Sequence, residues 1–118
     1  MSLAVEAVAE TDDGIVLTSA GADAAPGDEG YLIEVTPAKT VIRARKPAGA
    51  FYGTRTLLQM VGKDASGTAE WPCGRISDAP RFPWRGLMMD CSRTFLSMDY
   101  LRRYVDLVNQ WQIIACAR

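Results

Sequence analysis

Residues 78–91 read DAPRFPWRGLMMDC, a stretch in which a proline-rich connector runs straight into an apolar strand. Two prolines within four residues exclude a regular helix and favour extended backbone. Residues 86–91 are apolar on both faces until their last positions, as expected for a strand buried on two sides of a parallel sheet or barrel. We therefore place a domain boundary at the connector, between residues 1–79 and residues 80–118.

An amphipathic helix is predicted after this strand. Ser97 can cap its first turn, and Asp99 complements the positive end of the helix dipole. Arg102, Arg103 and Asp106 form its polar face. The apolar stripe recurs at helical spacing and comprises Leu101, Tyr104, Val105, Val108 and Trp111. A strand followed by such a helix is one βα unit, which cannot close a sheet by itself.

Upstream of the connector, residues 31–36 and 40–45 alternate between apolar and polar side chains. This alternation predicts two half-buried strands, and the short turn between them predicts an antiparallel hairpin. The apolar faces comprise Tyr31, Ile33, Val35, Ile42 and Ala44, and the polar faces comprise Glu34, Thr36, Arg43 and Arg45. Further strands are expected at residues 15–18 and 71–77, whereas residues 4–10 fit a strand or a helix equally.

Residues 47–61 switch to helical spacing. Pro47 suits the first turn of a helix, and Gly62 is well placed to end it. The predicted apolar stripe comprises Phe51, Thr54, Leu58 and Val61, with Leu57 at its side. Gly49 and Gly53 each weaken the helix by about 1 kcal/mol relative to alanine. Two poor helix formers one turn apart predict that their face packs closely against a sheet.

The composition excludes several classes of function. Thirteen basic and fourteen acidic residues leave a formal charge of -1, which gives no reason to expect a nucleic acid or an anionic membrane as partner. The absence of histidine removes Ser-His and Cys-His nucleophiles and the commonest metal ligand, and we expect no metal or cofactor. The sequence lacks a run of about 18 apolar residues, so no transmembrane helix is expected. Cys73, Cys91 and Cys116 fit no CxxC pattern and are expected to be free, mostly buried thiols.

Three stretches resemble glycoside hydrolase family 20 in their residues, order and spacing. They are residues 28–31 with the hairpin that follows, residues 47–59, and residues 76–93, of which the last is the most specific. The resemblance covers residues 28–108. It implies an α+β fold, in which an antiparallel sheet with a helix packed on one face precedes an isolated strand-helix unit from a (β/α)8 barrel.

The resemblance also implies a chemistry. Family members are retaining, substrate-assisted β-N-acetylhexosaminidases that remove terminal N-acetylglucosamine or N-acetylgalactosamine from glycans or chitooligosaccharides. The acetamido oxygen of the substrate attacks the anomeric carbon, an Asp orients the acetamido group, and a Glu acts as general acid. Nothing in residues 1–118 matches this Asp-Glu pair, so we expect a fragment that is inactive by itself. Relatives are often secreted, periplasmic or lysosomal, and the sequence does not determine the compartment.

Arg93 is the candidate substrate-binding residue. By the resemblance, it corresponds to the arginine that grips hydroxyls of the terminal sugar. It follows strand 86–91, so it would lie at the C-terminal mouth where barrel active sites are built. A guanidinium offers donors in a fixed fork, which suits adjacent sugar hydroxyls. Thr94 stands where the family usually has His, and residues 109–118 depart from the family's Asn- and His-rich second strand, as expected for a truncated or frame-shifted tail.

Plainer interpretations stand beside these functional ones. Arg93 also fits a surface or salt-bridged arginine, and Asp90 fits a structural carboxylate paired with Arg85 or Arg93. Three tryptophans are candidates to stack on sugar rings: Trp71, Trp84 and Trp111. The last two are expected to be packing residues, because one lies in the connector and the other on the apolar stripe.

Two expectations concern partners. The alternative to an enzyme fragment is a non-catalytic carbohydrate- or protein-interaction module. In a fragment, strand 86–91 and the helix after it would lack the rest of the barrel, and exposed apolar strand and helix faces associate. We therefore expect a homo-oligomer that forms through residues 85–114, as a swapped or helix-paired dimer.

Overall fold

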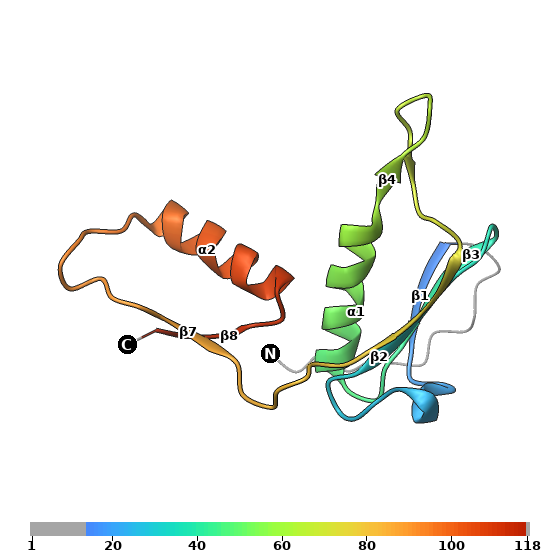
Figure 1. The fold of residues 1–118 in the computed structure, drawn as a ribbon, viewed down its shortest axis with the longest axis horizontal. Coiled ribbons are helices and arrows are strands. Elements are labelled where there is room, and N and C mark those ends of the chain that lie inside the picture. Colours follow the sequence, from blue (N-terminus) through green and yellow to red (C-terminus); the bar gives the residue numbers. More distant parts are fainter. Residues whose placement is uncertain (1–13, 118) are drawn as a thin grey trace. The chain divides into compact units, whose positions relative to one another are not determined.

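A computed structural model describes residues 14–117, and the predicted hairpin is confirmed (Figure 1). Strands β2 (Tyr31–Val35) and β3 (Lys39–Arg43) pair antiparallel, with Ile33 opposite Ile42. The side chains predicted to face inward are buried. The expectation for residues 4–10 falls outside the described residues. The chain divides after Ala79 into two compact units, which are described separately.

The sheet of the first unit is mixed, so the prediction of a purely antiparallel sheet is wrong. Its order is β1-β3-β2-β6, where β1 is Gly14–Thr18 and β6 is Gly74–Asp78. Strand β1 pairs parallel with β3, while β6 pairs antiparallel with β2. The parallel pair arises because β1 lies beside β3 and not beside β2, its successor in the chain. Strand β6 begins later than predicted, after Pro72, which lacks the N–H that a strand ladder needs.

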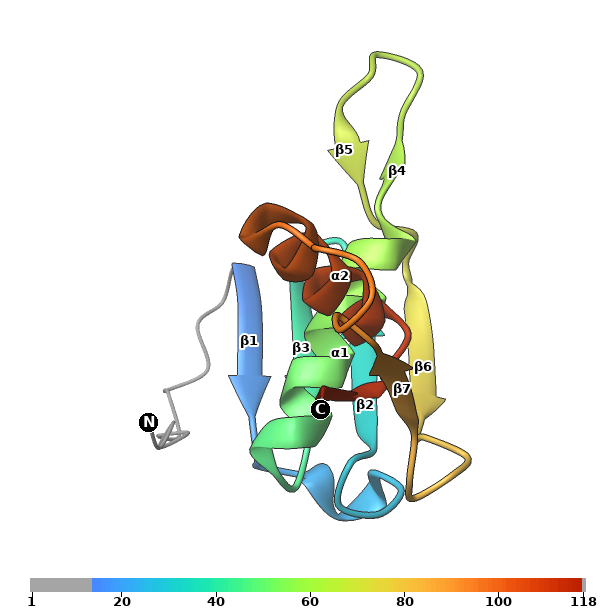
Figure 2. The ribbon, with the colours of Figure 1, turned by 90° about the vertical axis from the view of Figure 1, so that its left-hand side faces the viewer.

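Helix α1 (Pro47–Met60) packs on one face of this sheet, as predicted, but through a different stripe. Its buried residues are Gly49, Tyr52, Gly53 and Leu57. The predicted stripe is largely outward, and Leu58 is 60% exposed. Figure 2 shows α1 in front of β2 and β3, with β1 and β6 at the two edges.

Gly49 and Gly53 explain why α1 buries a different face from the predicted one. A Cβ at Gly53 would lie 2.6 Å from Cγ2 of Ile42, and a Cβ at Gly49 would lie 2.3 Å from the carbonyl oxygen of Gly30. The glycine face therefore approaches the sheet more closely than any larger side chain would permit. The predicted close packing at these glycines is confirmed, whereas a count of apolar residues alone selects the wrong face.

The end of α1 also differs from the prediction. Gly62 does not adopt the left-handed conformation of a helix-ending glycine, since the described glycines with positive φ are Gly14, Gly21, Gly27 and Gly67. Val61 is already extended, and Gly62 starts β4 (Gly62–Lys63), which pairs with β5 (Ala69–Glu70). This hairpin projects beyond the sheet (Figures 1 and 2).

The core of the first unit lies between α1 and the sheet. Its buried members are Tyr31, Ile33, Val35, Ile42, Ala44, Tyr52 and Leu57. Tyr31 and Ile42 are fully buried. The Tyr31 hydroxyl donates to Oδ2 of Asp78 over 2.7 Å and is 2.6 Å from Oγ1 of Thr56. One buried hydroxyl thus connects β2, α1 and β6, just before the chain leaves the sheet.

The second unit is a β-α-β arrangement. Strands β7 (Gly86–Met89) and β8 (Ile114–Ala117) pair parallel, and helix α2 (Met98–Gln110) lies between them in the chain and contacts β8. Oγ of Ser97 accepts from the N–H of Tyr100 over 3.2 Å, which confirms the predicted cap. The expectation of an isolated strand is wrong, because residues 114–117 supply a second strand where a divergent tail was predicted.

Burial in the second unit is lower than its apolar sequence predicts. Strand β7 was predicted to be buried on both faces, yet Met88 is 83% exposed. Within the described residues, β7 has one neighbouring strand, so its side chains have little to pack against.

Cys73 and Cys91 are exposed, so the prediction of mostly buried thiols is wrong for both. The side chain of Cys116 lies outside the described part of the chain. Neither α1 nor α2 is long and apolar enough to cross a membrane, as judged over residues 14–117.

Candidate functional site

The candidate site is the loop between β7 and α2, residues 90–97. Arg93 lies in this loop, beyond the carboxyl end of β7, and its side chain is exposed. The order of strand, loop and helix therefore puts Arg93 at the end of the strand that the sequence predicted. Thr94, the neighbour that departs from the family pattern, is exposed as well.

A short turn at the start of the loop is formed by Asp90. Its Oδ1 accepts from the N–H of Ser92 over 2.7 Å and from the Ser92 hydroxyl over 2.5 Å. The hydroxyl bond is the larger of the two effects that hold the pKa of Asp90 below its ordinary value. The predicted pairing of Asp90 with Arg85 or Arg93 is wrong, because Ser92, two residues away, already closes the turn.

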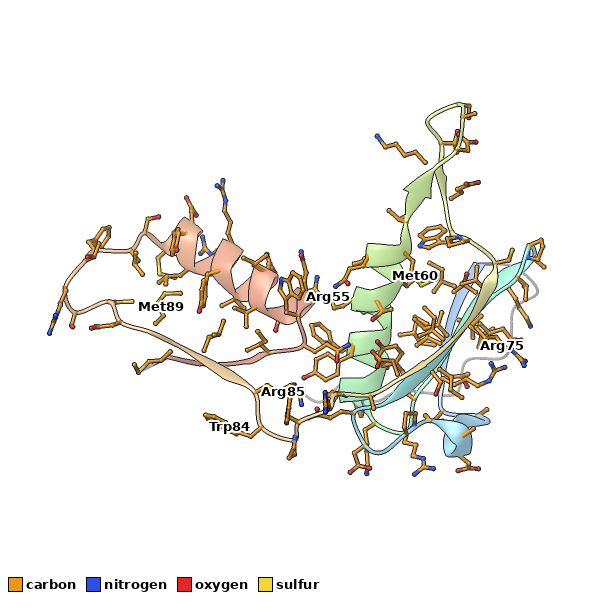
Figure 3. The ribbon with its side chains drawn as sticks, viewed as in Figure 1. Arg55, Met60, Arg75, Trp84, Arg85 and Met89 are labelled. Carbon is orange, nitrogen blue, oxygen red and sulfur yellow. The ribbon has the colours of Figure 1, made fainter. Side chains whose placement is uncertain are left out.

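Arg85 has a structural role at the other end of β7. Its Nε donates to the carbonyl oxygen of Gln112 over 2.6 Å, and its Nη1 donates to that of Phe82. These bonds join the connector to the residues just before β8. Figure 3 labels Arg85 beside Trp84 at the start of β7.

The three tryptophans separate into two kinds. Trp71 is half-buried against the core of the first unit, and its Nε1 donates to the carbonyl oxygen of Leu57 over 2.9 Å. Trp84 is 79% exposed and Trp111 is 72% exposed, so the expectation that these two pack is wrong for the described residues. Trp84 lies in the connector, and Trp111 is the C-cap of α2.

A second polar cluster, on the sheet face away from α1, was not singled out from the sequence. Glu34 Oε1 accepts from Nη2 and Nε of Arg75 over 2.7 and 3.0 Å, and its Oε2 is 3.3 Å from Nη1 of Arg43. Figure 3 shows Arg75 on that side of the sheet. These residues border a shallow hollow of about 510 Å³. The alternation of β2 and β3 placed Glu34 and Arg43 on one face, but only strand pairing brings Arg75 beside them.

The pKa of Glu34 should depend on this cluster. The Arg75 hydrogen bonds and charge, followed by those of Arg43, hold the pKa of Glu34 below its ordinary value of 4.5. The resulting stabilisation is present above the ordinary value and is lost as the pH falls through the lower, folded-state value. We expect Arg75→Gln to raise the pH at which the Glu34 carboxyl is half-protonated. NMR of the Glu34 carboxyl carbon as a function of pH measures this midpoint. Arg102→Gln, on α2, is the matched control, and an unchanged midpoint in Arg75→Gln would contradict the assignment.

Comparison with known proteins identifies the family. Residues 1–79 match the family model described as glycosyl hydrolase family 20, domain 2. The chain belongs to glycoside hydrolase family 20. Residues 82–113 match the model of the family 20 catalytic domain, which contains the loop with Arg93. The resemblance seen in the sequence is therefore confirmed.

Relatives of this family 20 chain include a β-hexosaminidase of Akkermansia muciniphila, 38% identical over 68% of this chain and 16% of the relative. A β-hexosaminidase subunit beta of Mus musculus is 37% identical over 67% of this chain and 15% of the relative. Among solved structures, Streptomyces plicatus N-acetyl-β-hexosaminidase in complex with Thio-NAglucal has a TM-score of 0.79 at 37% identity. That match covers 92% of this chain and 23% of the Streptomyces chain. The chain thus spans less than a quarter of these relatives.

Proposed function

We propose that this family 20 chain supplies the small domain and the first strand-helix unit of a retaining, substrate-assisted β-N-acetylhexosaminidase. Residues 1–79 form the small domain, and residues 80–118 form the start of a (β/α)8 catalytic barrel. The substrate is a terminal N-acetylglucosamine or N-acetylgalactosamine on a glycan or chitooligosaccharide. The observation that carries the proposal is the match of two family 20 models, in succession, over residues 1–79 and 82–113.

Arg93 has the role of binding hydroxyls of the terminal sugar. Its position after the carboxyl end of β7 supports this role, because barrel enzymes build their sites from the loops at that end. A guanidinium donates several hydrogen bonds in a fixed plane, which suits neighbouring sugar hydroxyls. The turn made by Asp90 and Ser92 shapes the backbone directly before it.

The chain by itself is inactive. The reaction needs a carboxylic acid whose pKa is raised enough to protonate the leaving oxygen. Among the described residues, the carboxylates with a resolved pKa shift are Glu34, Asp64 and Asp90, and all three are shifted downward. None of the three is shifted in the direction that a general acid requires. The purified chain should therefore release no p-nitrophenol from p-nitrophenyl N-acetylglucosaminide, and clear turnover would contradict this expectation.

A chimera tests the role of Arg93 in an active context. Residues 14–113 would replace the equivalent segment of the Streptomyces plicatus enzyme, with which the fold is shared. We expect hydrolysis by the chimera and a loss of about ten- to a hundredfold in kcat/KM for Arg93→Ala, since a charged hydrogen bond contributes about 1.5–3 kcal/mol. Arg103→Ala, on the exposed outer face of α2, is the control and should leave kcat/KM unchanged.

The outcomes of the chimera experiment are distinct. A folded but inactive chimera would contradict the proposed activity. An active chimera that is indifferent to Arg93→Ala would preserve the activity and remove the role of Arg93.

A non-catalytic carbohydrate-interaction module is the second candidate, and the exposure of Trp84 and Trp111 favours it. An exposed indole presents a flat apolar surface with a polar edge, which suits the face of a sugar ring. Titration of the chain with N-acetylglucosamine and chitin oligomers distinguishes the two. Saturable shifts of either indole N–H signal in NMR would support the module, and unchanged spectra would support the enzyme fragment.

We also propose that the chain forms homo-oligomers through residues 85–114. Within residues 14–117, strands β7 and β8 form a two-stranded sheet with open outer edges, and several apolar side chains of β7 and α2 are exposed. Open strand edges and apolar faces are the usual causes of association.

A further inference from the structure

Helix α2 presents two different apolar faces. On one face, Leu101 and Tyr104 are half-buried and Val108 is 2% exposed. The adjacent face is open: Met98 is 61% exposed and Val105 is 46% exposed. A shallow groove of about 410 Å³ runs along this open face and is lined by Met98, Leu101, Arg102, Val105 and Asp106.

Opposite charges lie along one edge of this groove. Arg102 and Asp106 are one helical turn apart, and both side chains are exposed. Arg102 pairs with Asp99 over 3.2 Å, but both members are highly exposed, so this pair is weak and easily exchanged. Asp106 makes no hydrogen bond or ion pair with any residue that the structure describes.

We propose that a second copy of this chain docks on this groove, with the two α2 helices antiparallel and centred at the level of Tyr104. Arg102 and Asp106 are equally spaced about that level, so each Arg102 meets the partner's Asp106 along the same edge. The Val105 side chains meet at the centre. A parallel two-fold pair would instead set the edge with Arg102 and Asp106 against the opposite, Leu101 edge of the partner's groove, so the charges select the antiparallel arrangement. The inference rests on the proposed association through residues 85–114 and assigns its contact surface.

The expected dimer is weak. Two helices of 13 residues bury less surface than the roughly 1,600 Å² of a standard interface, so association should be reversible and concentration-dependent. Opposite charges in such a small interface mainly determine orientation and specificity. Salt should therefore weaken the dimer, because the two ion pairs remain close to solvent.

Sedimentation velocity of the full chain over a range of concentrations tests the proposal. Arg102→Asp and Asp106→Arg should each lower the association constant at least about tenfold, because either change sets like charges together. An equimolar mixture of the two variants should restore association, since every pair across the interface is again opposite in charge. The double variant Arg102→Asp/Asp106→Arg should also associate. Arg103→Asp, an equal charge change on the far side of α2, is the control and should behave as the unmodified chain.

Each result has a definite consequence. A dimer that is insensitive to both single variants would overturn this inference while the proposed association through residues 85–114 stands. Single variants that weaken the dimer without recovery in the mixture would overturn the antiparallel pairing. A chain that is monomeric at every concentration would overturn both the association and the inference, and leaves the hexosaminidase proposal to be judged by the chimera.

Discussion

Gly49→Ala should lower the free energy of unfolding of the first unit by about 2 kcal/mol, even though alanine is the better helix former. Helix propensity alone favours alanine by about 1 kcal/mol. Against this gain, the added Cβ would lie 2.3 Å from the carbonyl oxygen of Gly30 and 3.1 Å from Cβ of Ala44. Overpacking of this kind costs about 1–3 kcal/mol, and contact with rigid backbone puts the cost at the upper end.

Urea unfolding, followed at the Trp71 indole signal, measures this effect. The indole N–H bonds to Leu57 of α1, so its signal reports on the packing of the helix. Gly74→Ala is the matched control, because Gly74 has ordinary negative φ and nothing within 4 Å of the added Cβ. An increase in stability in Gly49→Ala would mean that the gain in helix propensity outweighs the cost of packing a methyl group against Gly30.

Tyr31→Phe should lower the stability of the same unit by about 1–3 kcal/mol. The ring is fully buried, and its hydroxyl donates to Asp78 and bonds to Thr56. Removal of the hydroxyl breaks a hydrogen bond to the Asp78 carboxyl, and a hydrogen bond to a charged group contributes about 1.5–3 kcal/mol. Because Asp78 is exposed and Thr56 is half-buried, water replaces part of what is lost. The ring itself still fills its site, so the effect isolates the hydroxyl.

A double-mutant cycle with Thr56→Val checks this assignment. If the two hydroxyls bond to each other, the second substitution should cost clearly less in the presence of the first, with a coupling of about 0.5–3 kcal/mol. Additive effects would show that the Tyr31–Thr56 bond does not contribute to stability. Urea unfolding of the unmodified chain, the two single variants and the double variant provides the measurement.

Features that depend on neighbouring residues were predictable. The alternation of residues 31–36 and 40–45 determines which side chains face inward, because the side-chain period of a strand is two. The Ser97 cap and the acidic first turn of α2 are likewise local. The position of Arg93 followed from the order of strand, loop and helix. In these cases the physical cause lies within a few residues, so one sequence is enough.

Features that depend on residues far apart in the chain were not predictable from the sequence. The face that α1 buries was missed because glycines contribute to packing by what they lack, and a hydrophobic count gives them no weight. The Glu34–Arg75 pair requires β6 to lie beside β2, although 41 residues separate the two side chains. The parallel pairing of β1 with β3 has the same origin.

The sequence of this chain by itself thus determines its family and the types of its elements. The periodicity, the helix caps and the connector at residues 78–91 are signals that act over short distances along the chain. Which faces meet, and which carboxylates are tied to arginine or serine, became known only with the folded arrangement. Those properties depend on backbone approach and strand neighbours, and both are set by the packing of elements that lie far apart along the chain.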